Sequence, residues 1–172
     1  MNAKQQRRTK MRNEITGGCL CGAIRYHAKS NPKWISYCHC KMCQKAYGQA
    51  SGIFLGFTKD VLVITKGNPK KYKSSAWAER SFCDNCGSPV GVSYTDLDSV
   101  LIGTLDNPDY WPPNGCHLGI ESKIQWDLIK DTLPQWRTED DPDFIEAVKA
   151  SKSDEHSGTP KCTVVNCTIY GY

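Results

Sequence analysis

Seven of the ten cysteines stand in three short groups, a spacing at which thiolates bind metal ions or carry out redox chemistry. Zinc favours four tetrahedral sulfur and nitrogen ligands, and a C-x-x-C turn followed by glycine presents two sulfurs to one ion. Gly87 is expected to give that turn its backbone freedom. A single C-x-x-C also occurs in redox motifs, but three tight groups in one chain indicate zinc. The groups are Cys19-Leu-Cys21, Cys38-His-Cys40-Lys-Met-Cys43 and Cys83-Asp-Asn-Cys86.

The three groups divide by the number of ligands that each kind of zinc site needs. Four protein ligands close a structural site, whereas catalytic zinc keeps three and leaves its fourth position open. Cys19, Cys21, Cys83 and Cys86 make a closed set that joins an early loop to a later knuckle. The remaining set is Cys38, Cys40 and Cys43, which we expect to bind a second zinc that is open to a small molecule. Two zinc ions per chain are therefore expected.

Other arrangements of the second set fit the same spacing. Its three cysteines can take His39, His117 or Cys116 as a fourth ligand and form another closed site. They can also share one zinc with the first set or remain free thiols. Cys162 and Cys167 lie far along the chain and are interpreted as incidental thiols.

The beginning of the chain bears on whether the cysteines form disulfides instead. The opening run, MNAKQQRRTKMRN, is basic and polar and no apolar segment follows it, which argues against a secretory signal. No stretch approaches the roughly 18 consecutive apolar residues of a membrane span. We therefore expect a cytoplasmic protein with no membrane partner, in which clustered cysteines bind metal rather than form bridges.

The charge is too evenly balanced to predict a nucleic-acid partner. The net charge of +4 comes from 22 Lys and Arg against 18 Asp and Glu, and part of it lies in residues 1–13, which we expect to be a disordered tail. Away from that tail the balance is near neutral. Nothing in it predicts a basic face for DNA or RNA.

Short β-strands must position the cysteines. Turn residues at 67–69 and 112–115 separate segments rich in β-branched and aromatic residues, so the sequence predicts a mainly β fold over residues 14–137. A short helix and a flexible tail are expected in 138–172, with Asp141 as the N-cap, Pro142 at the first position, and Phe144, Ile145 and Val148 on one face. The expected strands are 23–28, 50–57, 61–65, 88–94, 100–105 and 117–121.

Four segments in order give the chain a family resemblance. GGCLCGAIRY, CHCKMCQKAYG, FCDNCGSPV and HLGIESKIQWDLIKDTLPQW resemble the glutathione-dependent formaldehyde-activating enzyme family over about residues 16–136. The resemblance implies an Mss4-like complex β-sheet fold with zinc knuckles. It also implies that the quartet Cys19, Cys21, Cys83 and Cys86 holds a structural zinc, and that the trio Cys38, Cys40 and Cys43 holds a catalytic zinc.

The resemblance further implies a reaction and its substrates. Such a protein is a carbon–sulfur lyase similar to S-(hydroxymethyl)glutathione synthase, in which the co-substrate glutathione or another thiol adds to formaldehyde or a related small aldehyde. The glutathione carboxylates need cationic partners, and Lys41, Lys45 and Arg80 are candidates by position. Many relatives carry a basic residue directly after the third cysteine of the trio, where this chain has Gln44.

A function of a different class uses the same fold. The chain can be a non-catalytic, zinc-stabilised module of Mss4-like fold that binds another protein. The trio discriminates between the two hypotheses, because a pure interaction module has no need of an open metal position.

Overall fold

The structure is a computed structural model and describes residues 14–142 and residue 145. The expectations for the basic tail, for Phe144 and Val148 of the C-terminal helix, and for Cys162 and Cys167 lie outside these residues. Pro142 and Ile145 are helical, and the Ile145 N–H donates to the Asp141 carbonyl at 2.9 Å, as expected for a helix that begins there. Within the described residues, no helix is long and apolar enough to cross a membrane.

A small antiparallel sheet is formed by three strands in the order β1-β2-β5. Its first two strands alternate between buried and more accessible residues, as a sheet with one covered face requires, whereas the third has no buried residue. A bridge between Gly17 and Leu105 connects it to the rest of the molecule. The strands are β1 (Ile15–Gly18), β2 (Arg25–Ala28) and β5 (Leu62–Lys66).

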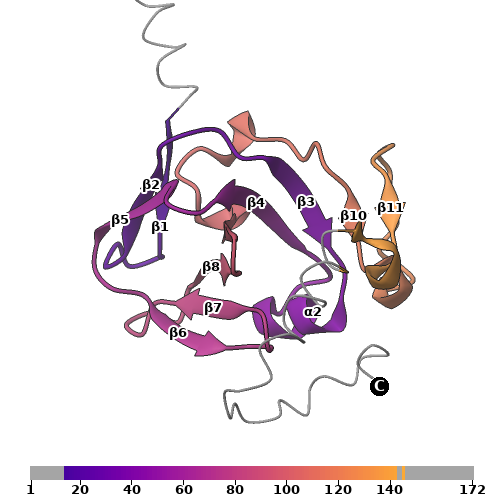
Figure 1. Cartoon of the computed structure of the whole chain (residues 1–172), viewed down its shortest axis with the longest axis horizontal. Helices are drawn as coiled ribbons and strands as arrows, with labels where there is room; N and C mark the ends of the chain where they lie inside the picture. Colours follow the sequence, from indigo (N-terminus) through magenta and orange to yellow (C-terminus); the bar gives the residue numbers. More distant parts are fainter. Residues whose placement is uncertain (1–13, 143–144, 146–172) are drawn as a thin grey trace, which may run out of the picture.

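A larger sheet of eight strands has the order β11-β10-β3-β4-β9-β8-β7-β6. Neighbouring strands are antiparallel except that β10 runs parallel to both β3 and β11. Its strands are β3 (Trp34–Cys38), β4 (Gly52–Thr58), β6 (Lys70–Lys73), β7 (Glu79–Phe82), β8 (Pro89–Ser93), β9 (Leu97–Leu101), β10 (His117–Leu118) and β11 (Gln135–Trp136). In Figure 1 the small sheet lies to the left, β3 and β4 lie above the centre, and β6 and β7 lie below it.

Strand β4 separates two apolar clusters. Leu55 and Phe57 point to one side and are fully buried in the main cluster, which also contains Cys19 and Cys83. Phe54 points to the other side and packs in a second cluster with Cys43. Because successive side chains on a strand point to opposite faces, the two cysteine sets lie in different clusters served by one strand.

The mainly β fold expected from the sequence is confirmed. The strands expected at 50–57, 61–65 and 88–94 occur with ends shifted by a few residues. The strands expected at 100–105 and 117–121 end early, because the chain enters the 3-10 helices Ile102–Thr104 and Ile120–Ser122. Gly119 makes the second change of direction with φ of 73°, a value that other residues rarely adopt.

Helix α2 (Lys41–Tyr47) begins inside the trio segment and is not expected from the sequence. Cys40 is its N-cap and accepts a hydrogen bond from the Cys43 N–H at 3.4 Å. Gly48 ends it with φ of 62°. The sequence signal for this helix is weak, because the helix has only seven residues and its N-cap is a cysteine rather than Ser, Thr, Asp or Asn.

Candidate functional site

The quartet is assembled from two turns. Cys19 and Cys21 follow β1, and Cys83 and Cys86 lie between β7 and β8. Their four sulfurs all lie within 4.8 Å of one another, with 3.6 Å between Cys19 and Cys21 and 3.9 Å between Cys21 and Cys83. Four thiolates bound tetrahedrally to one zinc at about 2.3 Å stand about 3.8 Å apart. The quartet therefore fits a zinc ion in donor type, number and separation.

Hydrogen bonds favour the thiolate forms of Cys19 and Cys86, whereas burial raises the pKa of Cys83 to about 11. The Ile24 N–H donates to Cys19 Sγ at 3.2 Å, and the Asn85 side-chain amide donates to Cys21 Sγ at 3.2 Å. Hydrogen bonds from Ser88, first its hydroxyl and then its backbone N–H, lower the pKa of Cys86 to about 6. Gly87 has φ of 73°, which confirms the backbone freedom expected of it.

The trio lies where β3 passes into α2. Cys38 ends the strand, Cys40 caps the helix, and Cys43 lies buried in the first turn of the helix. The sulfurs of Cys38 and Cys40 are 3.3 Å apart, and all three sulfurs lie within 4.8 Å of one another. Three soft donors at this separation fit one zinc ion. A strand end and a helix start thus bring together three residues that are close in sequence.

The structure brings no fourth ligand from the described residues to the trio. Among residues 14–142 and 145, the group of donor atoms contains its three sulfurs and no further Cys, His, Asp or Glu. His39 Nε2 lies 2.9 Å from His117 Nδ1 instead, and Cys116 Sγ lies 3.8 Å from Ser36 Oγ. The quartet and the trio are separate groups, and the described cysteines form no disulfide.

Arg80 on β7 reaches the trio from across the sheet. Its side chain is 5% exposed, its Nη1 donates to the Tyr47 hydroxyl at 2.5 Å, and its Nη2 donates to Cys43 Sγ at 3.6 Å. Its guanidinium also lies over the Tyr47 ring, 5.0 Å from the centroid. Hydrogen bonds from Cys38 and Cys40, together with the Arg80 charge, hold the pKa of Cys43 well below its usual value.

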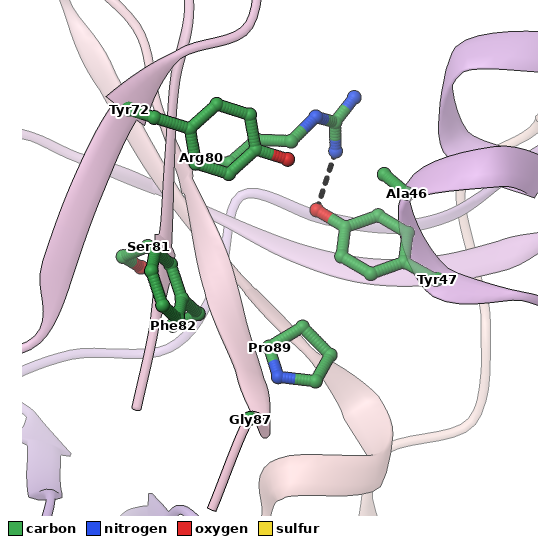
Figure 2. Close-up of a pocket in the computed structure, with 8 residues that line it drawn as sticks. All are labelled: Ala46, Tyr47, Tyr72, Arg80, Ser81, Phe82, Gly87 and Pro89. Atoms are coloured by element: carbon green, nitrogen blue, oxygen red, sulfur yellow. Dashed lines mark hydrogen bonds between the residues drawn. The ribbon is translucent and has the colours of Figure 1, made fainter. Parts of the chain in front are cut away.

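A cavity of about 260 Å³ lies beside Arg80. Figure 2 shows Arg80 and Tyr47 joined by their hydrogen bond, with Tyr72, Phe82 and Pro89 also lining the space. Three of the eight lining residues are aromatic, and one is the buried cation Arg80. None of the trio cysteines lines the cavity, so Arg80 is the group that connects the two.

The two lysines considered with Arg80 lie on α2 rather than on β7. Lys41 Nζ donates to Gln44 Oε1 and to the Ser122 carbonyl, both at 3.2 Å. Lys45 is exposed in the last turn. Gln44, which replaces the basic residue of many relatives, donates to the carbonyls of His39 at 2.6 Å and Ser122 at 3.0 Å. Gln44 thus links α2 by a hydrogen bond to the 3-10 helix Ile120–Ser122, which follows β10.

Sequence reasoning missed Tyr47 and the pair of histidines at positions 39 and 117. Nothing in the spacing of Tyr47 distinguishes it from the other aromatic residues, because its role depends on Arg80, 33 positions later. The two histidines are 78 positions apart and meet because β10 pairs with β3. Both relationships arise only from the order of strands in the large sheet.

Comparison with known proteins shows similarity to a curated protein and to solved structures. A protein of Schizosaccharomyces pombe described as an uncharacterized lyase is 39% identical over 85 residues, which cover 48% of this chain and 60% of that protein. The chain therefore spans about 60% of the length of this relative. A crystal structure of a Rhodobacter sphaeroides protein aligns with a TM-score of 0.44 and 16% identity, covering 70% of this chain and 98% of that one.

A family model covers more of the chain. The model described as glutathione-dependent formaldehyde-activating enzyme matches residues 14–119, a segment that contains the quartet and the trio. This match extends over more than half of the 172 residues. The chain therefore belongs to the glutathione-dependent formaldehyde-activating enzyme family.

Proposed function

We propose that this protein is a zinc-dependent carbon–sulfur lyase-type enzyme, similar to S-(hydroxymethyl)glutathione synthase, that joins a thiol such as glutathione to formaldehyde or a related small aldehyde. The observation that carries the proposal is the trio: three sulfurs converge and no fourth protein donor of the described chain joins them. Family membership and a relative described as a lyase support the same class of reaction.

The two cysteine sets have different proposed roles. The quartet would hold a structural zinc between the two turns, and Cys38, Cys40 and Cys43 would hold the catalytic zinc. When bound to three thiolates, such an ion supplies an open position that lowers the pKa of an incoming thiol. Three thiolates bring three negative charges, and Arg80 is the buried cation that offsets part of them.

The reaction needs no oxidant or reductant. A carbon–sulfur bond forms between the thiol sulfur and the aldehyde carbon, the carbonyl π electrons move to oxygen, and the thiol proton ends on that oxygen. Holding both reactants beside each other makes the addition effectively intramolecular. Burial raises the pKa of Tyr47, so its hydroxyl keeps a proton that it can donate while it accepts from Arg80. We assign Tyr47 to orienting the oxygen of the substrate.

The cavity beside Arg80 is the proposed place for the part of the thiol that does not react. Arg80 Nε is buried and has no hydrogen-bond partner in the described part of the chain, so an acceptor on the ligand would satisfy it. Arg80 is therefore the proposed contact for a glutathione carboxylate. We also propose Lys41 and Lys45 as contacts for the outer part of glutathione, because both lie on the helix that contains Tyr47.

Protein binding is the second candidate function, and one observation favours it. Trp126, Leu128 and Trp136 are 74%, 69% and 44% exposed, and all three lie between β10 and the end of β11. Large apolar side chains left in solvent can form part of an interaction surface. In this case the trio would bind no exchangeable metal, and the number of zinc ions per chain separates the two functions.

The test combines a metal count with an exchange measurement. Metal-replete protein should contain about two zinc ions per chain, and it should accelerate exchange between free glutathione and its formaldehyde adduct in two-dimensional exchange NMR. Cys40→Ser should lose one zinc and the acceleration, whereas Cys116→Ser should keep both. One zinc per chain that is inert to glutathione, with no acceleration by the wild type, would favour the binding module.

A further inference from the structure

A second polar cluster lies on the other face of β3 from the trio. Tyr37 and Cys38 are neighbours on β3, so their side chains point to opposite faces, and the His39 ring stacks on Tyr37. His39 is 2% exposed, and Tyr37 also stacks on His117 with centroids 4.3 Å apart. The cluster is thus distinct from the metal-binding sulfurs, although His39 belongs to the same segment.

The hydrogen bonds of this cluster fix where its protons lie. His117 Nε2 lies 3.1 Å from both oxygens of Asp131, and a carboxylate can only accept, so Nε2 carries the proton. With His117 neutral, Nε2 carries its one N–H, so His117 Nδ1 accepts from His39 Nε2 across 2.9 Å. His39 Nδ1 is therefore left with a lone pair.

That lone pair faces a second acceptor. His39 Nδ1 is buried without a hydrogen-bond partner among the described residues, and Asp127 Oδ2 lies 3.9 Å from it. The neighbouring ammonium of Lys123 does not fill the position, because it donates to the carbonyls of Ile124 at 3.1 Å and Asp127 at 2.7 Å. Two acceptors thus face each other with no donor between them, an arrangement that costs free energy unless a ligand supplies one.

The pair opens on a cavity of about 390 Å³. Its lining carries two carboxylates, Asp127 and Asp131, against one ammonium, Lys130. Ser51 and the ring of Tyr37 also line it. The cavity is large enough for a small organic molecule, and its acceptors and net negative charge select a cation with N–H groups.

We propose that this cavity binds a small molecule through a primary ammonium group, whose N–H donors bridge His39 Nδ1 and Asp127 Oδ2. One ammonium nitrogen reaches two acceptors 3.9 Å apart at ordinary hydrogen-bond lengths of about 2.9 Å. A metal ion is the poorer fit, because no third Cys, His, Asp or Glu donor of the described chain completes a group here. The site is additional to the proposed reaction and lies across β3 from it.

Histidine-ring NMR on the metal-replete full chain tests the proposal. Long-range proton–nitrogen spectra should show both His39 and His117 protonated on Nε2. Titration with n-propylammonium chloride should shift the His39 Nδ1 signal to saturation, while n-propanol and tetramethylammonium, which lack ammonium N–H donors, should not. A proton on His39 Nδ1, or an equal response to tetramethylammonium, would overturn the proposal.

Matched variants locate the ligand. Asp127 is one-third exposed, so Asp127→Asn should fold and should weaken n-propylammonium binding by about tenfold or more, because a charge-assisted hydrogen bond is lost. Asp109→Asn changes an exposed carboxylate outside the cavity and should bind as the wild type does. Undiminished n-propylammonium binding by Asp127→Asn would contradict the assignment. So would the finding that added zinc binds at His39 and Asp127 and displaces n-propylammonium, because the site would then be a metal site. None of these readouts depends on activity, so this proposal and the proposed function fail separately.

Discussion

The Arg80 guanidinium on β7 lies 3.6 Å from Cys43 Sγ on α2 and is almost entirely buried there. A buried cation beside a thiolate stabilises the charged form of both groups. The contact joins the far half of the large sheet to the trio, and it places a positive charge where three sulfurs must lose their protons to bind metal.

Arg80→Gln should raise the pH at which the trio takes up metal. Removing the guanidinium raises the pKa of Cys43, and metal binding needs the thiolate, so the midpoint of uptake should move upward by about one pH unit. The measurement is a pH titration of the cobalt–thiolate charge-transfer band. Arg25→Gln, which removes a cation paired with Asp106, is the control and should leave the midpoint unchanged. An unchanged midpoint in Arg80→Gln would show that the charge is not coupled to the trio.

Cys40→Ser and Cys83→Ser should have opposite effects on stability and metal content. Serine is a good N-cap, so Cys40→Ser should retain α2 and the fold while losing the zinc of the trio. Cys83→Ser should lower the thermal midpoint strongly, because a structural zinc contributes to the free energy of folding. Metal analysis with calorimetry checks both variants. Global unfolding of Cys40→Ser would contradict the division between quartet and trio.

Gly91→Ala should destabilise the protein by about 1–3 kcal/mol or more. A Cβ atom at Gly91 on β8 would stand 1.9 Å from the Ser99 carbonyl oxygen on β9, and the backbone of a central strand cannot yield cheaply. Overpacking of this kind costs about 1–3 kcal/mol or more. Gly103→Ala is the matched control, since nothing lies within 4 Å of the added atom. Urea denaturation gives the free energy of unfolding of both variants. Equal values would show that β8 and β9 move apart enough to accommodate the added methyl group.

Asp106 should make folding stability depend on pH in the acid range. Hydrogen bonding from Arg25 lowers its pKa in the folded state, so its contribution is complete above the unfolded pKa near about 4 and disappears as the pH falls through the lower folded value. Both partners are about one-third exposed, at 36% and 35%, so solvent screening limits the effect to at most about 1 kcal/mol. The stability difference between wild type and Asp106→Asn should therefore shrink below about pH 4. A difference that is constant from pH 7 to 3 would exclude this linkage.

The cysteine clusters could be predicted from the sequence because metal ligands must be brought together whatever the fold. Within each set, two or three sulfurs are neighbours in the chain, so local turns do most of the positioning. Helix α2 could not be predicted in the same way, since seven residues show little periodicity. The exposed edge strand β6, with the sequence KKYK, has no alternation to indicate it either.

The partners of the cysteines and histidines depend on strand order, which local patterns do not encode. Arg80 and Cys43 are 37 positions apart, and His39 and His117 are 78 apart. Each contact requires a particular sequence of pairings across the large sheet, including the parallel pair β3–β10. Position along the chain suggested Arg80 as a cation for a ligand, but only the folded sheet places it against Cys43.

Cys40 Sγ accepts the Cys43 N–H that begins α2 and is also one of the trio sulfurs. A seven-residue helix has little stability of its own, so its first turn depends on the contacts with Ser122 and Arg80 and opens when these break, while both sheets remain intact. Each such opening would pull Cys40 and Cys43 apart. The quartet sulfurs lie in turns beside paired strands and have no comparable way to separate. A metal ion should therefore dissociate faster from the trio than from the quartet, because α2 is short.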